Sequence, residues 1–325
     1  MIADAVIRDA IAHAIDRVDL AGLGPRQAGK VRDAYALGDR RLLVTTDRVS
    51  AFDRVIGLVP LKGQVLNLLS AWWFEQTRDL VANHLLSVPD PNVSLVVEAR
   101  PLPVEVIVRG YITGITSTSL WTLYAQGVPQ PYGLDLPAGL QRNDPLPRPV
   151  ITPTTKAQAG QHDERLTCAE VVERGLVDAV LWRQVEQTAL ALFARGQQVA
   201  QRAGLILVDT KYEFGLIDGA LALIDEVHTP DSSRYWDGAE YPAAIAAGAE
   251  PPSHDKEHLR RWLVDRNYRG EGAVPPLDPE FVVALAARYI DVYERLSGLA
   301  LIPAAPPAGP RIAAALHAAG IAGAR

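Results

Sequence analysis

Apolar residues recur at helical spacing in several stretches of the chain. In residues 2–18 they repeat about every four positions among charged residues, which predicts an amphipathic helix and not a signal peptide. The same spacing predicts further helices at 63–76, 167–175, 178–203 and 278–298. Thr167 with Glu170 forms a capping box, and Asp278 before Pro279 is an N-cap signal, so two of these helices have defined starts.

Other stretches are rich in β-forming residues and are separated by turn residues. KVRDAYAL and RRLLVTTD predict a hairpin that turns at Gly38-Asp39, and LILVDTKYEF and ALALIDEV predict another that turns at Asp218-Gly219. SLVVEAR and PVEVIVRG predict two more strands. Residues 136–149 are rich in Pro, Gly and Asn, so we expect no regular structure there.

The order of these elements predicts an α+β fold with two lobes. Residues 1–110 are expected to form a small antiparallel-sheet lobe, and residues 111–325 a larger α+β lobe with a helical C-terminal extension. The length of 325 residues agrees with two domains, or one with large insertions, at ~150 residues per domain.

Composition narrows the class of protein. With 48% hydrophobic and 22% charged residues, the chain has an ordinary globular composition. A net charge of -6 gives no electrostatic footprint for nucleic acid or an anionic membrane, and we expect neither as a partner. No stretch approaches the ~20 apolar residues of a membrane span. The single cysteine, Cys168, excludes an intrachain disulfide and favours a reducing compartment, by default the cytoplasm.

The strand LILVDTKYEF carries the densest chemistry. Strand alternation places Asp209, Lys211 and Glu213 on one face, and the returning strand ends at Asp225-Glu226. Carboxylates beside a lysine suit Mg²⁺ and a nucleoside triphosphate, although a solvent-facing polar side of the hairpin would have the same pattern.

The hairpin register makes the shared-metal hypothesis testable. A two-residue turn at Asp218-Gly219 pairs Glu213 with Ile224 and turns Asp225 to the other face. If Glu213 and Asp225 bind one metal ion, we therefore expect a three-residue loop or a bulge.

Several cations lie at predicted strand or helix ends, where they can bind phosphates and carboxylates. They are Lys30, Arg32, Arg109, Lys211, Arg234, Lys256 and Arg260. Taken singly, each is also compatible with an ordinary surface charge. The segment around Lys30 lacks the Walker A and kinase glycine patterns, so it is not identified as either loop.

Two further groups have structural explanations that we favour. His254 and His258 have the spacing of zinc-binding histidines, but Pro251 and Pro252 place His254 at a helix start, and a zinc site needs a third ligand. Cys168 lies inside a capped helix, where a cysteine acts as a small apolar residue and not as a nucleophile.

Taken together, the motifs resemble the phosphoribosylaminoimidazole-succinocarboxamide synthase (SAICAR synthetase) family. The matching segments are GKVRDAY, LLVTTDRVSAFD, PVEVIVRGYITG, ITPTTKAQAGQHDE, LILVDTKYEFG, IDEVHTPDSSRYW and DKEHLRRWL. They occur in family order over about three quarters of the chain. The resemblance implies a two-lobed fold with ATP in the cleft between the lobes.

The resemblance also implies an activity and residue roles. The activity is ATP-dependent joining of the carboxylate of carboxyaminoimidazole ribonucleotide to the amine of L-aspartate, through an acyl phosphate. The residues implied for catalysis are Lys211, Glu213 and Asp225, of which Glu213 and Asp225 hold Mg²⁺. Those implied for ATP are Lys30, Arg32 and Ala99. Those implied for the substrates are Asp47, Ser50, Asp53, Arg109, Arg234, Lys256 and Arg260.

One position departs from the family pattern. Ile115 stands where the family's RGYITGS has a serine, so Thr113, Thr116 or Ser117 would have to supply the hydroxyl near the substrate phosphate. The extra length slightly favours a monomer over a homodimer. A small-molecule kinase with the same ATP cleft and a nucleotide-binding protein without turnover remain as alternatives.

Overall fold

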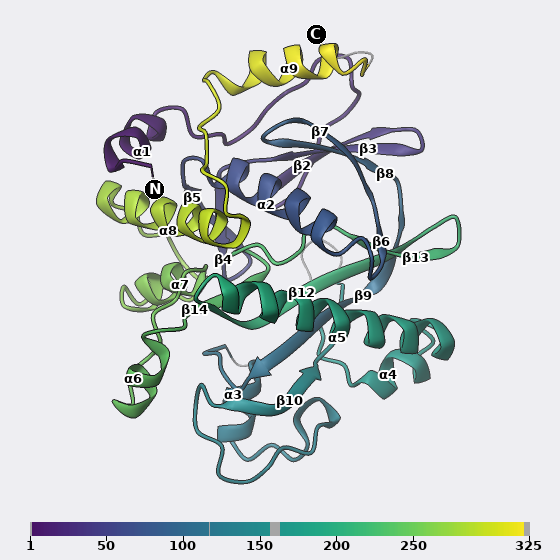
Figure 1. Cartoon of the computed structure of the whole chain (residues 1–325), viewed down its shortest axis with the longest axis vertical. Helices are drawn as coiled ribbons and strands as arrows, with labels where there is room; N and C mark the ends of the chain where they lie inside the picture. The colour runs from purple at the N-terminus through teal and green to yellow at the C-terminus, as the bar shows by residue number, and fades with distance from the viewer. Residues whose placement is uncertain (1, 117, 157–162, 322–325) are drawn as a thin grey trace.

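The computed structural model describes residues 2–116, 118–156 and 163–321. The helices are α1 (Asp4–Ile11), α2 (Lys62–Gln76), α3 (Leu120–Ala125), α4 (Cys168–Glu173), α5 (Ala179–Arg202), α6 (Tyr241–Ala246), α7 (Glu257–Val264), α8 (Pro279–Ser297) and α9 (Ala308–Ala318), with a 3-10 turn at Pro131–Gly133. The strands are β1 (Gln27–Ala28), β2 (Arg32–Leu37), β3 (Arg40–Thr45), β4 (Arg48–Ala51), β5 (Arg54–Leu58), β6 (Ala82–Asn83), β7 (Leu85–Asp90), β8 (Val93–Val97), β9 (Arg100–Tyr111), β10 (Pro145–Ile151), β11 (Thr154–Thr155), β12 (Leu205–Ile217), β13 (Ala220–Ile224) and β14 (Ser233–Asp237). The mixture confirms the predicted α+β class (Figure 1).

The smaller sheet has the strand order β1-β2-β3-β8-β7. Its hairpin β2–β3 closes at Gly38-Asp39 as predicted, and Gly38 has a φ of 74°, which glycine adopts without steric cost. Helix α9 lies against this sheet (Figure 1). Its Ile312 and Leu316 share a buried cluster with Tyr35 and Leu42 of the sheet. The C-terminal helix therefore completes the core of the smaller sheet.

The larger sheet has the order β10-β9-β12-β13-β6, with β11 beside β9 and β14 beside β12. The long strands β9 and β12 pair antiparallel at its centre. Helix α5 runs along these strands (Figure 1) and buries Val185 and Phe193 in the main core. The main core also takes in buried side chains of α2 and α8, such as Trp73 and Tyr289. The site residues on β9 and β12 thus rest on a rigid, well-packed layer.

The sheets divide the chain earlier than residue 110. The smaller sheet ends with β8 at Val97, and β9 already belongs to the larger sheet. Glu98 and Ala99 connect the two sheets. Helix α9, which falls in the expected C-terminal lobe, covers the smaller sheet instead. The lobes are therefore not simple halves of the chain.

Two local predictions were wrong in extent. The N-terminal helix ends at Ile11 and not near residue 18, because the N–H of Ile15 donates to the carboxylate of Asp47 (2.7 Å) and Val18 packs into the core of the smaller sheet. Residues 145–149, expected to be irregular, belong to β10. This strand lies at the end of the sheet's strand order, where prolines are tolerated because one side needs no ladder hydrogen bonds.

Two predicted helices begin or end at the expected signals. Thr167 and Glu170 form the capping box of α4, and Asp278 caps α8, which Gly298 ends with a φ of 71°.

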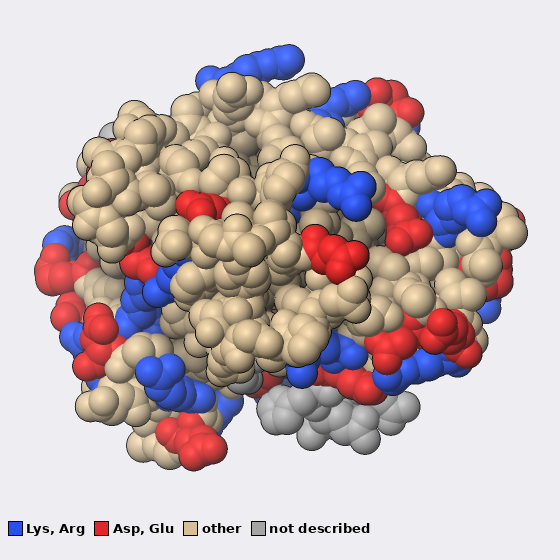
Figure 2. Space-filling view, turned by 90° about the horizontal axis from the view of Figure 1, so that it is seen from below, with Lys and Arg blue, Asp and Glu red and all other residues tan. Residues whose placement is uncertain are grey.

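Within the described ranges, no helix is long and apolar enough to cross a membrane. On the face drawn in Figure 2, basic and acidic side chains are intermixed on a largely uncharged surface.

Candidate active site

The polar row of β12 is largely buried, and each of its charged side chains has a partner. Lys211 Nζ lies 2.7 Å from Glu213 Oε1 and 2.8 Å from Oε1 of Glu105 on the adjacent β9. Asp209 and Glu213 are each 8% exposed, and the intervening Tyr212 is fully buried in the core. The interpretation of this row as a solvent-facing polar side is therefore wrong. Buried charges of this kind require partners, and here they have them.

The β12–β13 hairpin has the regular register, without the three-residue loop or bulge that we expected if Glu213 and Asp225 bind one metal ion. Glu213 pairs with Ile224, and the ladder continues to the two-residue turn. Asp225 follows the strand with a φ of 69°, a left-handed conformation that aspartate tolerates better than most residues. Glu213 and Asp225 nevertheless line one cavity. We infer that the change of direction at Asp225, and not a bulge, brings the two carboxylates together.

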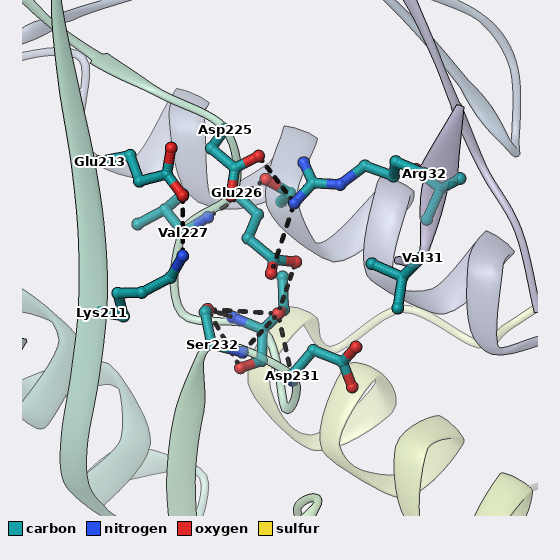
Figure 3. Close-up of polar contacts among 12 residues, drawn as sticks. Val31, Arg32, Lys211, Glu213, Asp225, Glu226, Val227, Asp231 and Ser232 are labelled. Carbon is teal, nitrogen blue, oxygen red and sulfur yellow. Dashed lines mark hydrogen bonds and ion pairs between the residues drawn. The ribbon is translucent and has the colours of Figure 1, made fainter. Parts of the chain in front are cut away.

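Arg32 of β2 connects the smaller sheet to this hairpin. Its guanidinium lies 2.8 Å from Asp225 Oδ1 and 3.4 Å from Glu226 Oε1 (Figure 3). Burial lowers the pKa of Arg32, but the charges of Asp225 and Glu226 outweigh burial and raise it. The ion pair spans the two sheets, so its geometry depends on their relative position.

Two lysines keep Glu213 ionised. Burial raises the pKa of Glu213, but the charges of Lys211 and Lys156 outweigh it and lower the pKa to about 2. Lys156 Nζ donates a hydrogen bond to Glu213 Oε2. Glu213 is thus a fixed negative charge at neutral pH. Lys156 belongs to the quoted ITPTTKAQAGQHDE segment, in which 157–162 lie outside the described residues.

The cavity next to Glu213 has a volume of about 160 Å³, and we call it the linker cavity. One wall is the connection between the sheets, including Ala99, and another is apolar, with Leu43 and Ile224. Glu213 and Asp225 line its charged side. It combines an apolar wall with paired carboxylates, as a nucleotide with a metal ion requires.

A second cavity, of about 200 Å³, lies further along the same strand, and we call it the arginine cavity. Asp209 accepts from Arg109 Nη1 at 3.2 Å and from Arg234 Nη1 at 2.7 Å. Glu257 lies 3.5 Å from Arg234 Nη2 and 3.1 Å from Arg260 Nη1. Carboxylates and guanidinium groups alternate, so the arginines are held in place with further N–H donors available.

Ile115 also lines the arginine cavity, with Thr116 and Ser119 beside it. The hydroxyl of Thr113 donates to Asn143 instead (2.6 Å). Ser117, the third residue expected to supply this hydroxyl, lies outside the described residues. Thr116 is therefore the described member of the three expected hydroxyls at the cavity wall.

Lys256 enters the arginine cavity from the start of α7. Its Nζ lies 3.1 Å from Ser50 Oγ and 3.4 Å from Asp231 Oδ2. The same Asp231 oxygen is 2.8 Å from Lys62 Nζ of α2, and Tyr289 of α8 donates to Oδ1 at 2.6 Å. Ser50 and Lys256, two of the expected site residues, are thus brought together.

Three expected site residues lie elsewhere. Lys30 and Asp53 form a pair (2.6 Å) in which both side chains are more than half exposed. Asp47 is 3% exposed and accepts from the backbone N–H groups of Ile15 and Gly63 at 2.7 and 2.8 Å. It lines a separate cavity of about 320 Å³ between α1 and the C-terminal extension. Its observed contacts hold the backbone together.

Comparison with known proteins agrees with this geometry. The model of the family described as SAICAR synthetase matches residues 26–276. The chain belongs to the SAICAR synthetase family. It is similar to phosphoribosylaminoimidazole-succinocarboxamide synthase of Legionella pneumophila (strain Lens), at 51% identity over 85% of this chain and 88% of that protein. It is also similar to the chloroplastic enzyme of Arabidopsis thaliana, at 45% identity over 94% and 76%.

A solved structure of SAICAR synthase from Saccharomyces cerevisiae, complexed with SAICAR, has the same fold. Its TM-score with this chain is 0.77, at 34% identity, over 89% of this chain and 100% of that one. The predicted two-lobed, SAICAR-synthase-like α+β fold is thereby confirmed.

Sequence reasoning missed several residues of this SAICAR synthetase site. Lys156 and Asp231 stand inside the quoted motifs and could have been found there, and Glu226 was noted beside Asp225 but given no role. Lys62 begins an otherwise apolar helical segment, and a lysine in such a place is a signal of a buried ion pair. Tyr289 carries no local signal, because only the tertiary fold brings it to Asp231.

His254 and His258, which have the spacing of zinc-binding histidines, contact different side chains in the structure. His254 Nδ1 lies 3.2 Å from Asp291 Oδ2, whereas the ring of His258 stacks on Phe281 at 5.3 Å between centroids. Burial raises the pKa of the Cys168 thiol to about 12, which leaves little reactive thiolate.

Proposed function

We propose that this SAICAR synthetase joins the carboxylate of carboxyaminoimidazole ribonucleotide to the amine of L-aspartate, using ATP, in purine biosynthesis. A carboxylate does not react with an amine at neutral pH, so it is first activated. Its oxygen attacks the γ-phosphorus of ATP and ADP leaves. The amine nitrogen then attacks the acyl phosphate, phosphate leaves with the electrons of the carbon–oxygen bond, and the nitrogen loses a proton.

The observation that carries this proposal is that one strand borders both cavities. Glu213 lines the linker cavity and Asp209 lines the arginine cavity, with Lys211 between them on the same face of β12. Four residues of strand span about 13 Å. A phosphate donor in one cavity and an anionic substrate in the other therefore meet near Lys211. Such a reaction depends mainly on positioning and charge neutralisation.

We assign the nucleotide to the linker cavity. Its adenine would lie beside Ala99, and Arg32 and Lys30 would contact its phosphates. Arg32 is already at the carboxylates, whereas the exposed Lys30 has to turn from Asp53 toward a phosphate. These roles follow the family motif, and the position of Ala99 in the cavity wall supports them.

Glu213 and Asp225 would hold the Mg²⁺ that accompanies ATP. Two carboxylates on one cavity fit the oxygen ligands that this ion prefers. In the part of the chain that the structure describes, no group of three or more His, Cys, Asp or Glu residues is arranged to hold a metal. Nucleotide phosphates would thus complete the coordination. The bound ion supplies neutralisation of phosphate charge.

We assign the ribonucleotide and aspartate to the arginine cavity. Arg109 and Arg234 would bind the ribonucleotide phosphate, with Thr116 near it. Lys256 and Arg260 would bind substrate carboxylates. The locked arginines support this assignment because a preorganised guanidinium loses little side-chain entropy on binding an anion. Of the further substrate contacts that the family motif implies, we retain Ser50 because it contacts Lys256, whereas Asp47 and Asp53 lie outside this cavity.

Assembly and location follow the same proposal. We expect a monomer, with small molecules as its partners and no nucleic acid or membrane. Light scattering on the purified protein measures the oligomeric state. A single cysteine suits a reducing compartment, and we place the protein in the cytoplasm.

The test is ADP release from Mg-ATP with the ribonucleotide, measured with and without L-aspartate while product absorbance is followed. The proposal predicts turnover that requires aspartate and forms product. ADP release that ignores aspartate would indicate a kinase or uncoupled hydrolysis. Stabilisation by Mg-ATP without any ADP release would indicate a nucleotide-binding protein.

A further inference from the structure

A buried ion group lies directly behind Lys256. Asp231 and Lys256 line the arginine cavity, but Lys62 and Tyr289 do not. Both of these side chains are fully buried, and they reach Asp231 from α2 and α8. They contact Asp231 from the side of the protein core and leave the cavity free. They are therefore placed to act on the site without touching a ligand.

The charges of this group do not balance. Two ammonium groups share one carboxylate oxygen, with Lys62 at 2.8 Å and Lys256 at 3.4 Å from Asp231 Oδ2. The hydroxyl of Tyr289 takes the other oxygen. The shorter contact of Lys256 is to Ser50, which is neutral. Lys256 therefore interacts more weakly with Asp231 than Lys62 does.

The charges around Lys256 also leave its positive charge weakly compensated. Burial is the main cause that lowers the pKa of Lys256, and the charges of Lys62 and Arg260 lower it further, although Asp231 and Glu226 oppose them. Arg260 and Glu226 have closer partners of their own, Glu257 and Arg32. A buried cation with so little compensation is stabilised when an anion binds beside it.

We propose that Lys62 and Tyr289 are positioning residues for substrate binding: they occupy both oxygens of Asp231, keep its contact with Lys256 long (3.4 Å), and so leave the ammonium group of Lys256 available to a substrate carboxylate. This inference rests on the proposed function and adds two residues to it. The carboxylate belongs either to L-aspartate or to the ribonucleotide. Without Tyr289 or Lys62, Asp231 turns toward Lys256 and competes with the substrate.

The experiment is a double-mutant cycle of Tyr289→Phe and Lys256→Met, read as kcat and as KM for each substrate. Tyr289→Phe keeps the buried ring and removes only the hydroxyl. We expect its KM for one carboxylate substrate to rise about tenfold, the effect of one charge-assisted hydrogen bond, with kcat within about twofold. In the Lys256→Met background the same change should have no further effect.

A second variant and a control distinguish a specific effect on substrate binding from a general loss of stability. Lys62→Met should raise the same KM as Tyr289→Phe and leave the KM for ATP unchanged. The control is Tyr35→Phe, which also removes a buried tyrosine hydrogen bond (2.6 Å, to the carbonyl of Val18) but lies in the smaller sheet. It should match Tyr289→Phe in loss of stability and retain the wild-type KM values.

The outcomes separate this inference from the proposed function. A KM effect confined to aspartate or to the ribonucleotide supports the inference and names the source of the carboxylate. Additive effects of Tyr289→Phe and Lys256→Met, or a change in kcat alone, overturn it while wild-type turnover stands. If the wild-type protein shows no aspartate-dependent turnover, the proposed function fails. Calorimetric binding of each substrate to the four proteins of the cycle then decides the inference by the same criterion of additivity.

Discussion

The linker cavity and the arginine cavity border the same strand but hold their charges differently. In the linker cavity, Glu213 and Asp225 come from one hairpin. Glu213 pairs with Lys156 and Lys211, whereas Asp225 pairs with Arg32 of the other sheet. In the arginine cavity, two of the carboxylates, Asp209 and Glu257, each lie between two arginines. The first cavity therefore presents carboxylates to a ligand, and the second presents arginines that carboxylates hold in place.

This contrast fits the ligands that we assign to the two cavities. Phosphates and a metal ion bring their own charges, so a cavity that receives them has to exchange partners. An anionic substrate needs donors that stay in place, since each side chain that must be ordered on binding costs roughly 0.5 to 1.5 kcal/mol.

Removal of a carboxylate charge from the linker cavity should abolish most of the activity. Glu213→Gln and Asp225→Asn should each lower kcat by about a thousandfold, since metal-assisted charge stabilisation is lost. Aspartate-dependent ADP release measures the effect, and circular dichroism checks the fold. Asp218→Asn, in the turn of the same hairpin, is the matched control and should retain activity. Near-normal turnover in both site variants would refute the assignment.

A change in the arginine cavity should act on binding and less on the chemical step. Arg234→Ala should raise the KM for the ribonucleotide about ten- to a hundredfold, with a smaller change in kcat, because ground-state binding is lost. Arg202→Ala, which removes an exposed arginine at the end of α5, should change neither constant. An effect confined to the KM for ATP would move Arg234 to the nucleotide site.

Asp47 is a family-motif carboxylate whose observed contacts are structural. Asp47→Asn can no longer accept from both backbone N–H groups with full strength, so it should reduce the free energy of unfolding by about 1 to 3 kcal/mol. Urea denaturation measures the loss, and the KM values should stay unchanged. A raised KM at normal stability would instead support the substrate contact expected from the family motif.

The smallest effect concerns acid. Because the folded state lowers the pKa of Glu213 to about 2, its ionised form contributes stability above the ordinary pKa of 4.5, and this contribution is lost as the pH falls toward 2. The difference in unfolding free energy between wild type and Glu213→Gln should therefore shrink between pH 5 and pH 3. A difference that grows in this range would mean that the pKa of Glu213 is raised in the folded state.

Local signals were sufficient for much of the fold. The Asp218-Gly219 turn and the alternation of β12 predicted the hairpin and its polar row, and the caps at Thr167 and Asp278 predicted two helix starts. These features depend on neighbouring residues, so the sequence contains them. The strand β10 was missed because its prolines indicate a loop unless the strand is known to lie at a sheet edge.

The rest of the site depends on contacts between distant segments. The left-handed backbone at Asp225 reverses the face that strand parity predicts, and nothing next to it in the sequence requires this conformation. Lys62 and Asp231 are 169 positions apart, and Tyr289 is 58 positions beyond Asp231. Such a group forms only when α2 and α8 pack together, so residue patterns could not predict it.

The course of the C-terminal segment has a consequence for how the molecule melts. Helix α8 belongs to the main core, and α9 to the core of the smaller sheet, while the connecting residues bond to Gln64 and Arg311 pairs with Asp90. One short stretch of chain is thus anchored in both cores. Because this stretch is anchored in both cores, unfolding of one core weakens the packing of the other. We therefore expect calorimetry to record a single cooperative transition. A chain cut after Gly298 should show two, with the smaller sheet melting first.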